Sequence, residues 1–201
     1  MTRPPEPWRI VLVVEDDSDG RAVAELVSRS GQDVTVDWLP ANGIGNIKRN
    51  AARLISLARD RLEGRRGCVA VVVDRDGRNP GREEPHRTIS RTCRRSRVEF
   101  IAAREALEAW FLADPGICRW LGVPLPGNTE GIRNPKRRVE QAFFRRTGRA
   151  YRRRRARLEV ARQATGVDAA RNGSARVAFE AVRRCLGAEN PSRPHARGVL
   201  G

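Results

Sequence analysis

Histidine and closely spaced cysteine are scarce in this chain, and their scarcity excludes a class of metal site. His86 and His195 are the only histidines, and the four cysteines lie far apart with no Cys-x-x-Cys pair. A zinc site is therefore not expected. Cys68 opens an apolar run and Cys185 lies in a helical pattern, which favours buried, reduced thiols.

Long apolar runs are also missing. No segment approaches the length that spans a bilayer, and no secretory signal pattern is present. We therefore expect a cytoplasmic protein without a membrane partner. A chain of 201 residues has room for one domain, or for one domain with an appendage.

The charge is strongly unbalanced. The chain carries 40 Lys and Arg against 24 Asp and Glu, for a formal net charge of +16. Polyanions such as nucleic acid are the expected partners of such a chain. Lys48 and Lys136 are the only lysines, so arginine-rich coding is an alternative source of the excess charge.

Two short apolar runs, residues 10–14 and 69–73, each end in a group of acidic residues. Uninterrupted β-branched runs are typical of buried strands in a parallel sheet, and ligands gather at the carboxyl ends of such strands. Carboxylates that cluster repel one another unless a cation lies between them, and carboxylates alone suit a hard ion such as Mg²⁺ or Mn²⁺. The alternative is helix caps and surface charges. The acidic residues are Glu15, Asp16, Asp17 and Asp19 after the first run, and Asp74 and Asp76 after the second.

Strand and helix patterns alternate over the first part of the chain. Strands are predicted at 8–14, 33–39, 68–73 and 97–101, and helices at 17–30, 47–62, 86–95 and 102–113, the first capped by Ser18 or Asp19. This order predicts an α/β fold with a mainly parallel, four-stranded sheet flanked by helices. We expect residues 1–115 to form this core. A basic helical C-terminal extension, 116–187, would pack on it, and 188–201 would form a disordered tail.

Other candidate binding residues lie outside the acidic groups. The Gly- and Asn-rich loop 42–46 and Lys48 could bind a phosphate at a helix start, or form an ordinary connector with a surface lysine. Glu105 and Glu108 would lie one turn apart on a helix, as a surface stripe or with Glu108 as a further metal ligand.

Arginines crowd residues 145–157, which predicts a helix that binds phosphate backbone rather than bases. The alternative is a solvated helix in an arginine-rich protein. The predicted nucleic-acid-binding residues are Lys48, Lys136, Arg145, Arg146, Arg152, Arg153, Arg154 and Arg155.

Val13-Val14-Glu15 with Asp19, followed by a strand that ends in Asp74-Arg75-Asp76-Gly77, resembles the TOPRIM domain. Topoisomerases, DnaG-type primases and OLD-family nucleases share this Mg²⁺-binding module. The segment from Glu108 to Asp114 (Glu-Ala-Trp-Phe-Leu-Ala-Asp) is similar to a Glu-x-Trp-x-Leu-x-Asp helix of a small bacterial TOPRIM-like family. That family is linked to phage defence and lies beside ATPase genes.

The resemblance implies roles for particular residues. Asp74 and Asp76 would match the aspartate pair that holds Mg²⁺, and Glu15 would match the glutamate of acid/base chemistry or metal binding. Asp16 stands where TOPRIM domains usually carry glycine. The only tyrosine, Tyr151, lies in the arginine run, so covalent strand transfer of the topoisomerase type is not expected.

These observations lead to one expected function and two alternatives. The expected function is Mg²⁺- or Mn²⁺-dependent hydrolysis of DNA or RNA, in a defence or toxin-like role that the resemblance implies. Catalysis is assigned to Glu15, Lys48, Asp74 and Asp76, with Asp19 and Glu108 as further metal ligands. One alternative is a non-catalytic subunit of an ATPase-linked defence complex, which binds nucleic acid and keeps its metal site for structure or sensing. The other is a response-regulator receiver, whose opening the segment 10–19 resembles; Asp16 and Asp17 would then hold Mg²⁺ beside a phosphoacceptor, Asp74.

Overall fold

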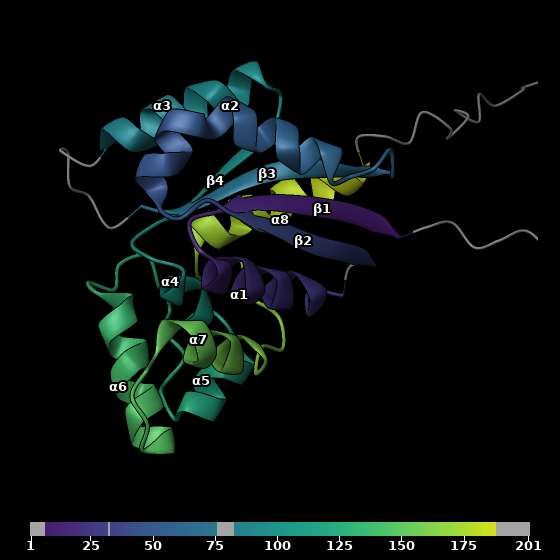
Figure 1. Cartoon of the computed structure of the whole chain (residues 1–201). Helices are drawn as coiled ribbons and strands as arrows, with labels where there is room; N and C mark the ends of the chain where they lie inside the picture. The colour runs from purple at the N-terminus through teal and green to yellow at the C-terminus, as the bar shows by residue number, and fades with distance from the viewer. Residues whose placement is uncertain (1–6, 32, 76–82, 188–201) are drawn as a thin grey trace, which may run out of the picture.

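A computed structural model describes residues 7–31, 33–75 and 83–187, with side chains up to residue 184. A four-stranded parallel sheet in the order β2-β1-β3-β4 forms its centre (Figure 1). The strands are β1 (Trp8–Val14), β2 (Val34–Pro40), β3 (Gly67–Asp74) and β4 (Glu99–Ala103). The helices are α1 (Asp17–Ser28), α2 (Ile44–Asp60), α3 (Glu83–Arg95), α4 (Glu108–Phe111), α5 (Pro115–Leu121), α6 (Pro135–Thr147), α7 (Arg153–Ala161) and α8 (Gly173–Gly187). The predicted α/β fold with a parallel sheet is confirmed.

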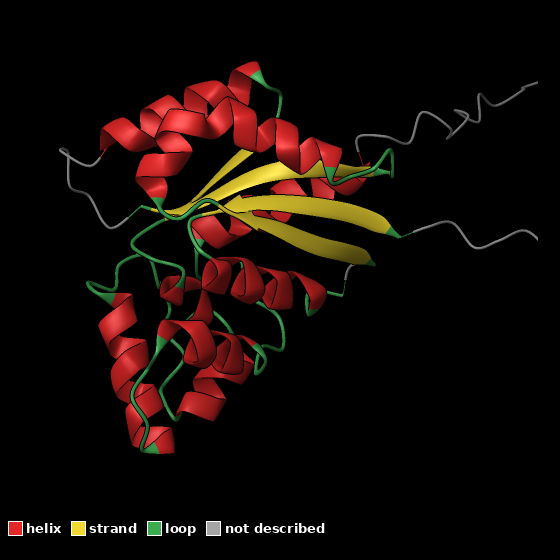
Figure 2. Cartoon of the chain, viewed as in Figure 1, coloured by secondary structure: helices red, strands yellow, loops and turns green. Residues whose placement is uncertain are grey.

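Helices cover both faces of the sheet, and two apolar cores result (Figure 2). On one face Val11 and Val13 of β1 pack with α2 and α3. On the other face Ile10 and Leu12 pack in one continuous cluster with α1 and with residues of α4 to α8, including Phe179. Alternate residues of β1 are therefore buried on opposite faces, as a wholly apolar strand requires. Helix α8, from the predicted extension, lies against the sheet and completes this second core.

The predicted helix over 102–113 is wrong. Ala102 and Ala103 pair with Val73 and Asp74 at the end of β4, so this segment stays extended. Glu105 has a φ of 65°, and a helix forms only at Glu108–Phe111. An alanine-rich segment favours a helix in isolation, but here strand pairing with β3 overrides that local preference.

Helix α1 begins at an acidic cap. The side chain of Asp16 accepts hydrogen bonds from the backbone N–H groups of Ser18 (2.7 Å) and Asp19 (3.1 Å). Asp19 in turn accepts from the N–H of Asp16 at 3.2 Å, which completes a capping box. The prediction of Ser18 or Asp19 as the cap is therefore wrong by two or three residues.

The cysteines divide into two kinds. Cys68 is disulfide-bonded, so the expected free thiol at this position is wrong. Sequence spacing alone does not reveal which cysteines approach one another in the fold. Cys93 and Cys118 are free and buried, and burial raises the pKa of Cys93 to about 12 and that of Cys118 to about 11. Neither thiol is ionised at neutral pH.

Within the described ranges, no helix combines the length and apolar character needed to cross a bilayer.

A close backbone approach at Gly67 makes this position intolerant of a side chain. A Cβ at Gly67 would lie 2.0 Å from the carbonyl oxygen of Arg9 on the neighbouring strand. We expect Gly67→Ala to lower the free energy of unfolding by about 1–3 kcal/mol, because the two strands must separate to admit the methyl group. Urea denaturation measures this, with Gly127→Ala as the control because no atom lies within 4 Å of its added Cβ. Equal stability of the two variants would contradict the expectation.

Candidate functional site

The carboxyl edge of the sheet brings Glu15 and Asp74 together. Glu15 directly follows β1, and Asp74 is the last residue of the adjacent strand β3. The Oε1 atom of Glu15 accepts a hydrogen bond from the backbone N–H of Asp74 at 2.9 Å. Asp74 Oδ1 accepts another from the N–H of Leu107 at 2.9 Å, which orients the carboxylate. The side chain of Glu15 and the end of β3 therefore meet at this edge. Asp76, which the sequence assigns to the same site, lies outside the described residues.

A guanidinium from the C-terminal half of the chain lies among these carboxylates. Arg157 of α7 is fully buried, at 0% exposure. Its Nη1 pairs with Asp19, and its Nη2 lies 2.8 Å from Glu108 Oε1 and 3.9 Å from Asp74 Oδ2. Burial lowers the pKa of Arg157 to about 10, so the group stays protonated at neutral pH. The chain thus supplies a cation of its own to the acidic residues.

Glu108 is the most deeply enclosed of these acids. It is 0% exposed, and its Oε1 accepts hydrogen bonds from Arg157 Nη2 (2.8 Å), Arg157 Nε (3.2 Å) and the hydroxyl of Tyr151 (3.3 Å). Its Oε2 has no hydrogen-bond partner within the part of the chain that the structure describes. Burial raises the pKa of Glu108, and burial together with the neighbouring Glu108 raises that of Tyr151. Arg157 is the cation in direct contact with this carboxylate.

Sequence reasoning placed Arg157 in a surface run that binds phosphate, and the structure places it in the interior. The feature of the sequence that could have revealed this burial is helical periodicity. Arg157, Val160 and Ala161 have the i, i+3 and i+4 spacing of one helix face, and all three are buried. An arginine on an apolar face requires an acidic partner, and Asp19 and Glu108 fill that role.

The acidic residues at this edge differ in their existing contacts, and these contacts affect whether each could bind a metal ion. Arg157 contacts Asp19 and Glu108 directly and lies 3.9 Å from Asp74 Oδ2, so it offsets part of the negative charge of all three. Glu15 and Asp74 present carboxylate oxygens at the edge of the sheet, the donor type that Mg²⁺ prefers. Over residues 7–31, 33–75 and 83–187, no group of three or more His, Cys, Asp or Glu side chains is placed to hold a metal. The assignment of Glu15, Asp19, Asp74 and Glu108 as metal ligands stays a prediction.

The segment from Glu108 to Asp114 binds distant parts of the fold together. Trp110 is buried, and its Nε1 donates to Ser174 Oγ of α8 at 3.0 Å. Asp114 is also buried and caps α5, because its side chain accepts from the N–H of Ile117 at 3.0 Å. Glu105 lies outside the helix, so the predicted shared helix face of Glu105 and Glu108 is wrong. The motif residues have structural contacts in addition to any chemical role.

The predicted phosphate-binding residues lie mainly on the surface. Lys48 is the fifth residue of α2, just past its first turn. Its Nζ lies 3.5 Å from Glu84 Oε1, an exposed pair that contributes little stability. Lys136 lies within 4.0 Å of Glu140. Lys136 and Arg153 both act to lower the pKa of Glu108, so positive charge from α6 and α7 lies near this carboxylate. The exposed arginines of the run 145–157 are Arg145, Arg146, Arg149, Arg152, Arg153, Arg154 and Arg155.

The residues that a receiver would use to hold Mg²⁺ have other contacts. Asp16 caps α1, and Asp17 Oδ1 accepts a hydrogen bond from Trp38 Nε1 at 3.0 Å. Asp17 Oδ2 also lies 2.7 Å from Arg21 Nε. The described ranges contain four parallel strands, β1 to β4. Asp16 and Asp17 are therefore engaged in helix capping and in contacts with Trp38 and Arg21.

The chain was compared with known proteins at three levels, and no family model, no curated protein and no solved structure matches it.

Proposed function

We propose that the protein hydrolyses phosphodiester bonds of nucleic acid, with a divalent cation at the carboxyl edge of the sheet. The single observation that carries this proposal is the meeting of Glu15 and Asp74 from adjacent strand ends, with Glu15 Oε1 2.9 Å from the N–H of Asp74. The resemblance of the two acidic segments to the TOPRIM domain supports the same assignment. The net charge of +16 suits a polyanionic substrate.

The proposed roles follow from position. Asp74, fixed by the N–H of Leu107, would hold Mg²⁺ or Mn²⁺ together with Glu15, and Asp76 is assigned to the same set from the sequence alone. A bound divalent ion supplies Lewis-acid polarisation of a phosphoryl oxygen. Glu15 is also the candidate base for the attacking water. Lys48 and the exposed arginines would hold the substrate backbone.

The test of this function is a cleavage assay on the full chain. Plasmid, single-stranded DNA and tRNA are incubated with the protein in Mg²⁺, Mn²⁺ or EDTA. We expect cleavage in a divalent ion, none in EDTA, and none with Asp74→Asn, because the variant loses the charge that holds the cation. Asp60→Asn is the matched control, since Asp60 is exposed at the end of α2 and has no part in the proposed site. Circular dichroism and urea denaturation check that both variants are folded.

Two outcomes contradict the nuclease. The first is cleavage that persists in Asp74→Asn at the rate of the Asp60→Asn control. The second is nucleic-acid binding without cleavage under every metal condition. Labelling of Asp74 by acetyl phosphate would instead support the receiver alternative.

A second candidate function is favoured by one specific observation. Arg157 pairs with Asp19, Glu108 and Asp74, so the acidic residues do not need a metal ion to be stable together. A non-catalytic subunit that binds nucleic acid, in company with an ATPase partner, is consistent with this arrangement. The defence role and the ATPase partner are proposals that come from the TOPRIM-like resemblance alone.

A further inference from the structure

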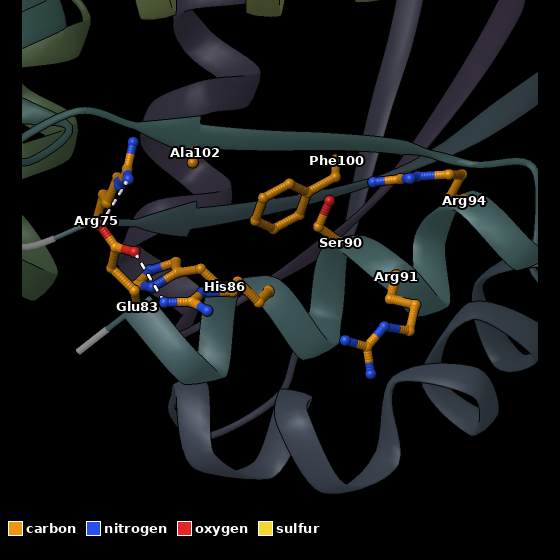
Figure 3. A pocket seen from close by; sticks show the side chains of 9 residues that line it. Arg75, Glu83, His86, Ser90, Arg91, Arg94, Phe100 and Ala102 are labelled. Carbon is orange, nitrogen blue, oxygen red and sulfur yellow. Dashed lines mark hydrogen bonds and ion pairs between the residues drawn. The ribbon is translucent and has the colours of Figure 1, made fainter. Parts of the chain in front are cut away.

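A groove lined by arginine lies between α3 and the edge strand β4 (Figure 3). Its volume is about 460 Å³. Phe100 and Ala102, two residues apart on β4 and so on one face of the strand, contribute its apolar side. Figure 3 shows Arg75 and Arg94 at its two ends, with the Phe100 ring and Ser90 between them. The groove thus combines one aromatic ring with cationic ends.

Four arginines line this groove, and one carboxylate accompanies them. Glu83 lies 3.5 Å from Arg75 and 3.2 Å from Arg87, so it offsets part of their charge. Arg91 and Arg94 form no ion pair with any other residue that the structure describes. Arg87, Arg91 and Arg94 follow the i, i+4, i+7 spacing of one helix face, and about 10 Å of helix rise separates the first from the last. That length matches roughly two or three phosphates of a nucleic-acid strand.

The groove begins at the candidate active site. Arg75 directly follows Asp74, and its N–H donates to Ala103 O at 2.8 Å, which fixes it beside the end of β4. His86, on the first turns of α3, has its Nε2 3.0 Å from the carbonyl oxygen of Asp74. Helix α3 then leads away from the carboxyl edge toward Arg94. A ligand that fills the groove therefore has one end next to Asp74.

We propose that this groove binds a single-stranded segment of nucleic acid and delivers it to the carboxyl edge of the sheet. The arginines contact phosphates, and an unpaired base stacks on the Phe100 ring, the combination that single-strand-binding proteins use. The delivery step rests on the proposed function, whereas binding in the groove does not. A duplex keeps its bases paired and cannot offer one to Phe100, so the groove prefers single strands.

Fluorescence anisotropy on the full chain tests the proposal. The probe is a labelled 12-nucleotide oligo(dT), titrated in EDTA so that no cleavage occurs. We expect Arg91→Ala/Arg94→Ala to bind about tenfold more weakly at low salt. The slope of log K against log salt should decrease by about 1.4, which is about 0.7 for each lost phosphate contact to a single strand. Phe100→Leu should weaken binding about tenfold with an unchanged salt slope, because it removes stacking and no charge.

Control measurements test whether the oligonucleotide binds in the groove rather than elsewhere on the basic surface. Arg176→Ala removes an exposed arginine on α8 and should bind as the parent protein does. Thermal melts confirm that every variant is folded. A duplex of the same length should bind at least tenfold more weakly than the single strand. A poly-glutamate peptide that binds as tightly as oligo(dT) would instead assign the groove to an acidic protein segment and overturn the proposal.

The failures of the two proposals are distinguishable. If Asp74→Asn binds oligo(dT) normally but no form of the protein cleaves, the groove stands and the nuclease does not. If the protein cleaves, but the arginine pair and Phe100→Leu bind as Arg176→Ala does, the nuclease stands and the groove proposal is wrong.

Discussion

Replacement of Arg157 by methionine is expected to lower the free energy of unfolding by about 3–5 kcal/mol. The guanidinium is fully buried and pairs with Asp19, Glu108 and Asp74. Methionine fills much of the same volume but leaves these carboxylates in the interior without their cation. Urea denaturation at neutral pH measures the loss.

Arg155→Met is the matched control for this prediction. Arg155 lies on the same helix and is exposed, so its replacement should change stability by at most about 0.5 kcal/mol. Equal stability of the two variants would show that Arg157 is not what holds the carboxylates together.

The deficit of Arg157→Met should shrink as the pH falls. Burial raises the pKa of Glu108 above its ordinary value, so the folded protein takes up a proton at a pH where the unfolded chain has none. Stability then decreases as the pH rises through that raised pKa, and a protonated Glu108 needs no cation. Urea denaturation of the variant at several pH values between neutral and the ordinary carboxyl range tests this. A deficit that stays constant or grows on acidification would contradict it.

Replacement of Asp114 by alanine is expected to lower the free energy of unfolding by about 3 kcal/mol. Asp114 is buried, and its two oxygens accept from the N–H groups of Ile117 (3.0 Å), Thr165 (3.1 Å) and Gly166 (2.8 Å). Alanine leaves these backbone donors without their acceptor. It also releases the segment after α7 from the start of α5. Urea denaturation gives the loss, and faster amide exchange at Thr165 and Gly166 locates it.

Asp114→Asn should lie between the parent and the alanine variant. The amide oxygen can still accept from Ile117 and Thr165, while the amide nitrogen faces the N–H of Gly166 and cannot accept from it. The exposed Asp60→Ala controls for the loss of an acidic residue. A variant with asparagine that is no more stable than the one with alanine would indicate that charge, rather than hydrogen bonding, stabilises this position.

The sequence was sufficient for those parts of the fold where local pattern and tertiary context agree. The runs 10–14 and 69–73 are short, wholly apolar and rich in β-branched residues, a pattern typical of buried parallel strands, and β1 and β3 were predicted correctly. The segment after Phe100 shows the opposite case. Its alanines favour a helix locally, and only the pairing of Ala102 and Ala103 with β3 makes it a strand. The local helix preference of these alanines does not reveal that they will pair with β3.

Within the candidate site, Glu15 and Asp74 could be placed from the sequence, whereas the partners of Arg157 could not. Glu15 and Asp74 follow recognisable strands, and parallel strands place their carboxyl ends at one edge, so their meeting follows from topology. Arg157 is separated from Asp19 by 138 residues along the chain, and it stands among arginines that are exposed. Its spacing with Val160 and Ala161 indicated a buried helix face, but no feature of the sequence indicated which acidic residues it would pair with.

The placement of Arg157 and α8 has a consequence for the order in which the chain can mature on the ribosome. The four strands are synthesised first, whereas Arg157, which neutralises Asp19 and Glu108, is synthesised later. Helix α8, whose Phe179 and Val182 lie in the apolar core on one face of the sheet, is synthesised later still. Until then a nascent chain would expose an unsealed apolar sheet and an acidic rim with no counter-charge. Exposed apolar surface of this kind is prone to aggregation, so chaperone binding before α8 is synthesised would favour correct folding.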